Sequence, residues 1–428
     1  MPFLMFLIGK TDAANGATMT TLTESLVKGN NLIGRLQFSE AEQLFKKALE
    51  LDPRSVVALV GLGRLALMRK QPSEALQLLD RALSIHPRHA EALAVKGIFF
   101  METEEFGPAI EVLEQAKASD PNLQMVYFNL GKSYCEVGQF AKAEQSLRKA
   151  LEMNRDHFEA YSQLSYIQIQ TGRMKEGIRS MLQAIRINPL YVKGYLILGS
   201  LYENAGKGEL VLRLYRNGLR HNPKAFPLRE RLCSLYALKL DFHTAYVEAL
   251  EIAKRRKNSY QDFLRVGTFA VALRKFETAE KAFKTSIDLN PKSWEGHYNL
   301  GELYMSAELM KEAREHYKAA VENNHNSYKP LNGLGLFLLM VEHNWDGAIQ
   351  FFKAALELAP SQAEPRFNIA LAYAKKGDFR SAEKFAASVL SLVKPDDRIY
   401  RETERLQAIL RAETLQSQIQ SHTFHSLK

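Results

Sequence analysis

Residues 127–134 read Tyr-Phe-Asn-Leu-Gly-Lys-Ser-Tyr, and a small residue, Ala143, follows nine positions later. The same arrangement returns at residues 297–304, which read His-Tyr-Asn-Leu-Gly-Glu-Leu-Tyr and are followed by Ala313. The starts of the two stretches, positions 127 and 297, are separated by five equal steps of roughly 34 residues. Repetition at such a period indicates a stack of similar supersecondary units.

Prolines mark the same period along most of the chain. A small residue, usually Gly, stands 24 positions before each mark, and Ala usually stands 12 and 5 positions before it. Large apolar residues fill the positions between them. At this repeat length the marks fall on Pro53, Pro87, Pro121, Arg155, Pro189, Pro223, Lys257, Pro291 and His325.

Each block of this period contains two apolar patterns of helical spacing, separated by a turn such as residues 136–139, Glu-Val-Gly-Gln. We expect the small residues where two helices approach too closely for a large side chain. Proline fits the link before the next helix, where its missing N–H and fixed φ cost little. One helical hairpin cannot bury its apolar face alone, so neighbouring hairpins must supply the rest of the core.

The pattern resembles the tetratricopeptide repeat family over residues 22–397. The resemblance implies an all-α fold, a right-handed α-solenoid superhelix of about eleven stacked helix-turn-helix repeats. The last two units contain one extra residue each, so their marks fall on Pro360 and Pro395. The expected units are 22–55, 56–89, 90–123, 124–157, 158–191, 192–225, 226–259, 260–293, 294–327, 328–362 and 363–397.

These units predict the organisation of the chain. Residues 1–21 are expected to be a disordered leader, residues 22–225 to hold six N-terminal repeats, and residues 226–397 to hold five C-terminal repeats. Residues 398–420 have an amphipathic pattern and are expected to form a capping helix, which a solenoid needs to cover its last apolar surface. Residues 421–428 are expected to be a disordered tail.

Two units depart from the pattern. Unit 192–225 has Val211 and Gly218 where Ala is expected, and unit 226–259 has Cys233 in the Gly position and Lys257 in the Pro position. Two alternative explanations fit these departures: a local change in superhelical curvature, or ordinary drift of the repeat sequence.

Nothing in the sequence indicates catalysis. Cys135 and Cys233, the two cysteines, are far apart and are expected to pack in helices rather than form a disulfide or a zinc site. The eleven histidines lack metal-ligand spacing, and neither a phosphate-binding Gly loop nor a nucleophile elbow occurs. The sequence therefore predicts a protein that is not an enzyme and has no cofactor and no metal, with cytoplasmic localisation.

The apolar run at residues 3–8 is too short to span a bilayer and lacks a basic lead-in, which leaves a weak interfacial anchor as the alternative.

The net charge is +9, and an excess of basic residues lies between positions 213 and 257. Such a patch attracts an acidic partner, an anionic membrane surface or a nucleic acid, or it is a solvated helix face that keeps the solenoid soluble. The predicted basic patch consists of Arg213, Arg216, Arg220, Arg229, Arg231, Arg255 and Arg256.

By the resemblance, the first helix of each hairpin lines a concave groove that holds the partner. Methionines suit variable apolar partners, and the amides of Asn129, Asn299 and Asn368 fall in one equivalent position that suits a partner's backbone. The alternative interpretation is that some of these side chains pack between neighbouring repeats and do not face a partner. The predicted groove residues are Met68, Met101, Met125, Phe128, Asn129, Lys132, Tyr166, Tyr298, Asn299, Asn332, Phe367 and Asn368.

The groove residues also exclude one binding mode of the family. Some members hold carboxylate termini with a clamp of lysines, asparagines and an arginine. Phe128, Tyr298 and Phe367 occupy the positions of its first lysine, so an extended or helical apolar peptide is expected instead.

The main hypothesis is a non-catalytic protein-protein interaction scaffold or adaptor that binds a peptide or protein segment in the concave groove. We expect no small-molecule substrate, and neither a nucleic acid nor a membrane as the principal partner. The first alternative is a self-assembling structural protein that polymerises through its groove or its solenoid ends. The second is binding of an anionic surface or a nucleic acid through residues 213–257.

Overall fold

The computed structural model describes the backbone of residues 13–324 and 326–425 and the side chains of residues 22–324 and 326–414. These residues form 23 helices and no strand, which confirms the all-α class. None of the helices in these ranges combines the length and the apolar character that a membrane-spanning helix needs. Contacts divide the chain into two units, one ending at Lys224 and the other beginning at Ala225.

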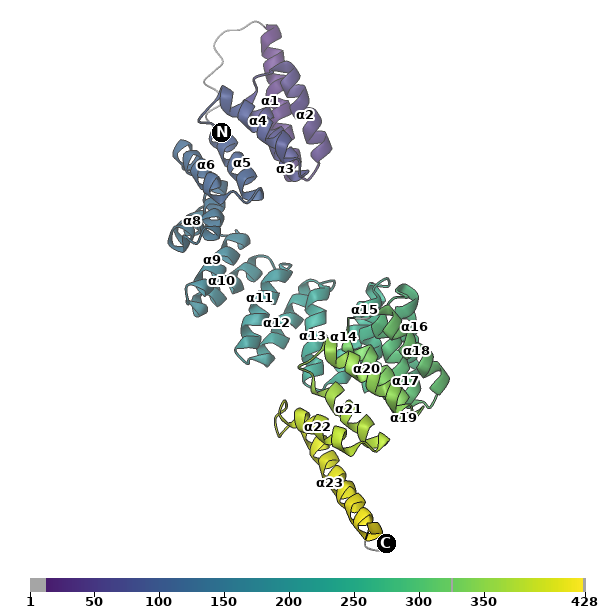
Figure 1. The fold of residues 1–428 in the computed structure, drawn as a ribbon. Coiled ribbons are helices and arrows are strands. Elements are labelled where there is room, and N and C mark those ends of the chain that lie inside the picture. The colour runs from purple at the N-terminus through teal and green to yellow at the C-terminus, as the bar shows by residue number, and fades with distance from the viewer. Residues whose placement is uncertain (1–12, 325, 426–428) are drawn as a thin grey trace. The chain divides into compact units, whose positions relative to one another are not determined.

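In the first unit, helices pair in chain order, and each second helix packs on the first helix of the next pair (Figure 1). The helices are α1 (Ala13–Gly34), α2 (Phe38–Leu51), α3 (Val56–Met68), α4 (Pro72–Ile85), α5 (Ala90–Glu102), α6 (Phe106–Ser119), α7 (Gln124–Glu136), α8 (Phe140–Met153), α9 (Phe158–Gln170), α10 (Met174–Ile187), α11 (Val192–Asn204) and α12 (Gly208–His221).

The second unit continues the alternation, and its last helix, α23, packs on α21 and α22 through the buried Leu406 and Leu410. The helices are α13 (Phe226–Leu238), α14 (Phe242–Arg255), α15 (Tyr260–Ala272), α16 (Phe276–Leu289), α17 (Trp294–Ser306), α18 (Met310–Asn323), α19 (Tyr328–Met340), α20 (Trp345–Leu358), α21 (Ala363–Lys376), α22 (Phe379–Leu390) and α23 (Arg398–His425).

The helical part is longer at both ends than the sequence predicts. Helix α1 begins at Ala13, so residues 13–21, assigned to a leader, are helical. Helix α23 runs to His425, past the predicted end of the capping helix at residue 420. Of the segments predicted to be disordered, residues 1–12 and 426–428 lie outside the described residues.

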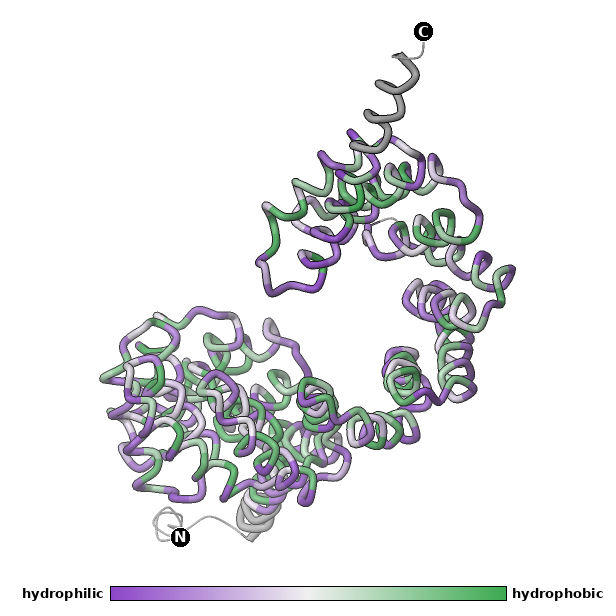
Figure 2. Tube along the Cα trace, turned by 90° about the horizontal axis from the view of Figure 1, so that it is seen from below, coloured by the Kyte–Doolittle hydropathy of each residue, from purple (hydrophilic) through white to green (hydrophobic). Residues whose placement is uncertain are grey.

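The links and turns follow from local hydrogen bonding. Before most proline marks stands Asp or Asn, whose side-chain oxygen accepts the N–H two residues on, as Asp120 Oδ1 does from Asn122 at 2.9 Å. At the turn within a pair, Gly138 has a φ of 75°, which glycine adopts at little cost. Figure 2 shows hydrophilic residues at these turns and along one side of the helices.

Within most pairs, a small residue of the first helix faces a large residue of the second. A Cβ on Gly131 would lie 2.6 Å from Leu147 Cγ, and one on Gly199 would lie 1.9 Å from the Tyr215 hydroxyl. Both large side chains are buried. The glycines are therefore required by close approach of the helices, as the sequence predicts.

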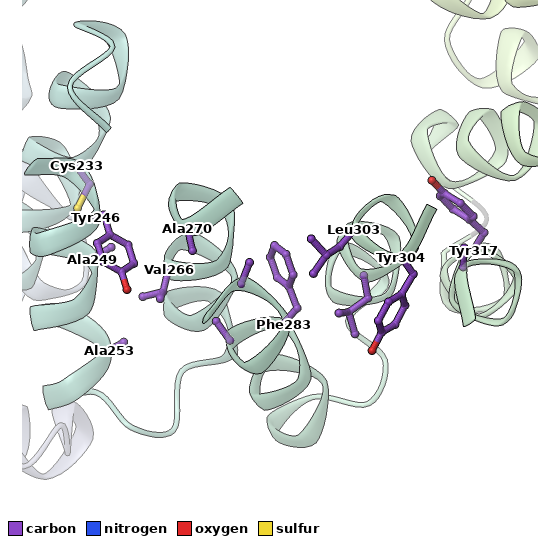
Figure 3. Packing of buried hydrophobic residues seen from close by; sticks show 14 of the residues in the cluster. Cys233, Tyr246, Ala249, Ala253, Val266, Ala270, Phe283, Leu303, Tyr304 and Tyr317 are labelled. Atoms are coloured by element: carbon purple, nitrogen blue, oxygen red, sulfur yellow. The ribbon is translucent and has the colours of Figure 1, made fainter. Parts of the chain in front are cut away.

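The core of the second unit shows how neighbouring pairs share apolar surface. Phe283 of α16 lies beside Leu303 of α17, and Tyr246 of α14 lies beside Val266 of α15 (Figure 3). These side chains belong to different pairs, so each hairpin completes the core of the next. Burial of this kind contributes about 25 cal/mol per Å² of apolar surface removed from water.

Two histidines face each other where α17 and α18 pack. The Nδ1 atoms of His297 and His316 are 2.9 Å apart, and the Tyr304 ring stacks on His316 with centroids 5.5 Å apart. Around them, the Tyr304 hydroxyl donates to Glu280, which also pairs with Lys284. Burial lowers the pKa of both His297 and His316 below the usual value. The contact between the two Nδ1 atoms requires one ring to donate and the other to accept.

Ala143→Leu should destabilise the protein by roughly 1–3 kcal/mol, because Ala143 is fully buried where α8 crosses α7. Ala141→Leu, an exposed position on the same helix, should change the free energy of unfolding by less than about 0.5 kcal/mol. Urea titrations followed by circular dichroism measure both. Equal effects of the two substitutions would show that the assignment of buried positions is shifted.

The free energy of unfolding should fall as the pH is lowered from 7.5 through about 6.5, the usual pKa of histidine in unfolded chains. Because the pKa values of His297 and His316 are lowered in the folded state, the unfolded state binds more protons in this range. The double variant His297→Gln, His316→Gln should reduce this pH dependence. Urea titrations over the pH range measure the slope. An unchanged slope in the double variant contradicts the prediction.

Candidate functional site

The first helices of neighbouring pairs usually pack on each other in the first unit: α3 on α5, α5 on α7, and α7 on α9. Among the described residues, α11 lacks such close packing on α9. Tyr191 stands at the N-terminal end of α11. Its ring contacts Phe158 of α9, with centroids 5.1 Å apart, and lies against Gly194, where a Cβ would be 2.6 Å from Tyr191 Cδ1. An aromatic ring thus lies between the first turns of the two helices.

A hydrogen bond fixes this ring. The Tyr191 hydroxyl and Ser162 Oγ of α9 are 2.9 Å apart, and either can be the donor. The equivalent position holds Ser55 and Ser293 in two other units, and in the preceding unit it holds His157, whose ring contacts Phe128 of α7. Beside this ring, between α9 and α11, lies a cleft.

We call this cleft, of about 580 Å³, the α9–α11 cleft. Ile169, Ile197 and Leu201 supply apolar surface, and the buried Met181 of α10 contributes from below. The remaining lining residues are Glu136, Ser162, Gln163, Ser165, Tyr166, Lys193 and Ser200.

The polar groups of the cleft fall into two kinds. Ser162 and Ser165 bond within the protein, since Ser165 Oγ donates to the Gly177 carbonyl at 2.7 Å. In the part of the chain that the structure describes, no side-chain hydrogen bond or ion pair engages Gln163, Lys193 or Ser200. An amide both donates and accepts, so Gln163 can pair with a peptide group. The cleft therefore offers apolar surface together with polar groups that can bind a partner.

Tyr166 is the predicted groove residue that lines the cleft, and half of its surface is exposed (50%). Met68 of α3 is also exposed, but it lies outside the cleft. Among the other predicted groove residues, Asn129, Asn332 and Asn368 are buried. The half-buried ones are Met101, Met125, Phe128, Lys132, Tyr298, Asn299 and Phe367.

Several of these side chains have contacts within the stack. Asn368 Nδ2 donates to Asn332 Oδ1 at 2.9 Å, and Asn332 Nδ2 donates to Glu364 Oε1 at 3.2 Å, so these amides join α19 to α21. The Phe128 ring lies 4.5 Å from His157, between centroids, and Tyr298 contacts Tyr317 edge-on. The structure thus places Asn332 and Asn368 inside the stack rather than on a free surface.

The predicted basic patch is divided between the two units. In the second unit, Arg229 pairs with Glu248, Arg255 with Glu251, and Arg256 with Glu230. In the first unit, Arg213 and Arg220 of α12 are exposed. Arg216 and Arg231 are exposed as well.

One carboxylate organises the paired part of this region. Asp262 of α15 is 1% exposed and accepts two hydrogen bonds from Arg256, both at 2.9 Å, and one from Arg265 at 3.1 Å. Arg256 also lies over the Phe226 ring of α13, 4.9 Å from its centroid. These charges therefore connect α13, the α14–α15 link and α15, and they are not free for a partner. Lys257, which replaces proline, follows Arg256 directly.

Sequence reasoning missed the residues on the α11 side of the cleft. Tyr191, Lys193, Ile197 and Ser200 belong to unit 192–225 or the position just before it, and the sequence indicates only that this unit departs from the pattern. One feature of the sequence could have pointed to this region: Tyr191, a large residue, stands two positions after Pro189. The described residues hold no group of three or more metal-ligating side chains.

Family models described as tetratricopeptide repeat match residues 32–83, 66–127, 125–157, 158–189, 264–327 and 339–403, which is more than half of the chain. The matched ranges end at residue 189 and begin again at 264, on either side of the two irregular units. No curated protein matches the sequence.

Several solved structures are similar. Yeast Tom70 is 14% identical, with 94% of this chain and 98% of that chain covered, at a TM-score of 0.44. PilF of Pseudomonas aeruginosa is 19% identical, with 51% and 99% covered, at 0.44. TTC0263 of Thermus thermophilus, a thermophilic tetratricopeptide repeat protein, is 23% identical, with 42% and 97% covered, at 0.37.

A double-mutant cycle of Ser162→Ala and Tyr191→Phe should give a coupling energy of about 0.5–1.5 kcal/mol, because the two hydroxyls form one hydrogen bond. Urea titrations of the wild type, both single variants and the double variant provide the four values. As a control, Ser162→Ala combined with Tyr161→Phe should be additive, since no hydrogen bond joins that pair in the described residues. Additive effects of Ser162→Ala and Tyr191→Phe would show that the hydroxyls do not hold the ring.

Proposed function

Because the chain belongs to the tetratricopeptide repeat family, we propose that it is a non-catalytic scaffold or adaptor that holds a peptide segment of another protein in the α9–α11 cleft. Tetratricopeptide repeat proteins are generally protein-interaction scaffolds, and their stacked hairpins present extended surfaces for partners. The observation that supports this site is the lack of close packing between α9 and α11 among the described residues, where the cleft lies.

The chemistry of the cleft fits a peptide. Ile169, Ile197 and Leu201 can receive an apolar side chain, whose burial is favourable by about 1.5–3 kcal/mol. Gln163 can hold the peptide group beside it, since its amide has no partner in the described residues.

The edges of the cleft add to this fit. Tyr166 brings an aromatic face with a hydroxyl, the type of residue that contributes most in protein interfaces. Glu136 and Lys193 place one charge of each sign at the cleft, which favours a particular orientation of the peptide.

A small-molecule site fits less well. Tyr166, Lys193, Ser200 and Glu136 are exposed, so the cleft is open rather than enclosed. Small-molecule sites bury most of the ligand in a concave, largely preformed pocket. An open cleft between parallel elements instead suits one or two anchoring side chains of a longer chain.

Tyr166→Glu should weaken peptide binding by at least about tenfold, because it removes an aromatic contact and adds a charge at the cleft. Peptides selected from a random phage-displayed library on the wild-type protein serve as probes in fluorescence anisotropy. Val137→Glu is the matched control, since it adds the same charge at an exposed apolar position outside the cleft.

Circular dichroism of both variants must remain helical. Equal affinity of Tyr166→Glu and wild type for the selected peptides would contradict the proposal. Sedimentation velocity of the wild type alone shows whether a second copy occupies the cleft, in which case Tyr166→Glu would dissociate the oligomer and the partner would be the chain itself.

A further inference from the structure

Most of the net charge of the chain lies in one stretch of the first unit. Residues 173–224 contain ten Lys and Arg residues and three Asp and Glu residues, a net charge of +7 out of +9 for the whole protein. This stretch contains α10, α11 and α12. It overlaps the predicted basic patch at Arg213, Arg216 and Arg220, but extends toward the N-terminus from there.

The basic residues gather on the outer faces of α10 and α12. On α10 the exposed residues Lys175, Arg179, Leu182 and Arg186 follow helical spacing, opposite the buried Met181. On α12 the same positions, one repeat later, hold Glu209, Arg213, Arg216 and Arg220. We call these eight residues the α10–α12 face.

Four arginines of this face have no partner among the described residues. In this part of the chain, no hydrogen bond or ion pair engages the side chains of Arg179, Arg186, Arg213 or Arg220. On each helix the two are seven residues apart, which is about 10.5 Å along the axis. Partners within the described protein therefore do not neutralise these charges.

The neighbouring pairs of the same unit lack this pattern. The positions equivalent to Arg179 and Arg186 hold Glu111 and Ala118 on α6, and Gln145 and Glu152 on α8. The repeat itself therefore does not require arginine at these positions. Four unpaired like charges on two helices repel one another and destabilise the folded state slightly, so a partner of opposite charge would stabilise it.

We propose that the α10–α12 face is a second interaction surface and that it binds an acidic segment of a partner protein. Guanidinium groups bind carboxylates through two parallel hydrogen bonds, which ammonium groups cannot do. Leu182, exposed between Arg179 and Arg186, adds an apolar contact that matches a chain with both carboxylates and apolar side chains. This surface lies on the side of α10 opposite Met181, which lines the α9–α11 cleft, so it is separate from the cleft.

Other anionic partners fit the face less well. It contains no aromatic residue on which a base of single-stranded nucleic acid could stack. Leu182 has no counterpart on a duplex backbone. Membrane binding of an amphipathic helix needs its apolar side, whereas α10 and α12 bury theirs in the stack.

The probe is a fluorescein-labelled peptide of about 20 residues composed of Glu, Leu and Ala, compared with the same peptide carrying Gln for Glu. The full-length wild type should bind the Glu peptide, with an affinity that falls as salt is raised, and bind the Gln peptide at least about tenfold more weakly. The variant R179Q/R186Q/R213Q/R220Q should lose at least about tenfold in affinity for the Glu peptide. Fluorescence anisotropy measures all dissociation constants.

The control variant K28Q/K47Q/R54Q/R88Q removes the same charge from positions elsewhere in the first unit whose side chains are exposed and unpartnered among the described residues. It should change affinity less than about twofold.

Equal loss in both variants would show attraction by net charge alone and overturn the proposal, as would undetectable binding of the Glu peptide. Tighter binding of duplex DNA or of phosphatidylserine vesicles than of the peptide would overturn it as well. The Tyr166→Glu variant should bind the Glu peptide like wild type. This result distinguishes a failure of the proposal for the α10–α12 face from a failure of the proposal for the α9–α11 cleft.

Discussion

The structure depends on the close approach of the two helices in each pair. A residue without a large side chain on the first helix faces a large apolar residue of the second, as Gly131 faces Leu147 and Gly199 faces Tyr215. This contact sets how the pair crosses and which faces remain to be covered by the next pair. Since each pair buries its surface only against its neighbours, the same constraint recurs along the chain and gives the sequence its regular period.

The stretch where the family pattern weakens carries the most individual chemistry. Between residues 190 and 263 the family pattern weakens, and other interactions hold the helices. In the first unit, the Tyr191 ring lies between α9 and α11 and is held by Ser162. In the second unit, Asp262 is buried with Arg256 and Arg265 beside Phe226, so ion pairs connect helices there. An ion pair at such a position costs desolvation that apolar packing does not, and its value lies in fixing one arrangement.

The two proposed surfaces follow from the same asymmetry of the helices. A helix in the stack has one side committed to its neighbours, and the rest of its surface is free to vary. The inner side of α9 and α11 presents apolar and amide groups, while the outer side of α10 and α12 presents guanidinium groups that are unpaired among the described residues. These chemistries suit different parts of a partner: anchoring side chains in the cleft and carboxylates on the outer face.

From the sequence alone, the period, the helical hairpins and the positions of small residues such as Gly131 and Ala143 could be determined, because each repeats many times and depends on local spacing. The sequence also located the irregular units. It placed Tyr166 among the groove candidates but could not separate it from Asn332 and Asn368, whose amides bond to each other across two pairs. Likewise, it could not tell Arg256, used by Asp262, from Arg213, which no described side chain engages. Those distinctions depend on contacts between residues far apart in the chain, and only the tertiary structure decides which side chains are consumed by packing and which remain for a partner.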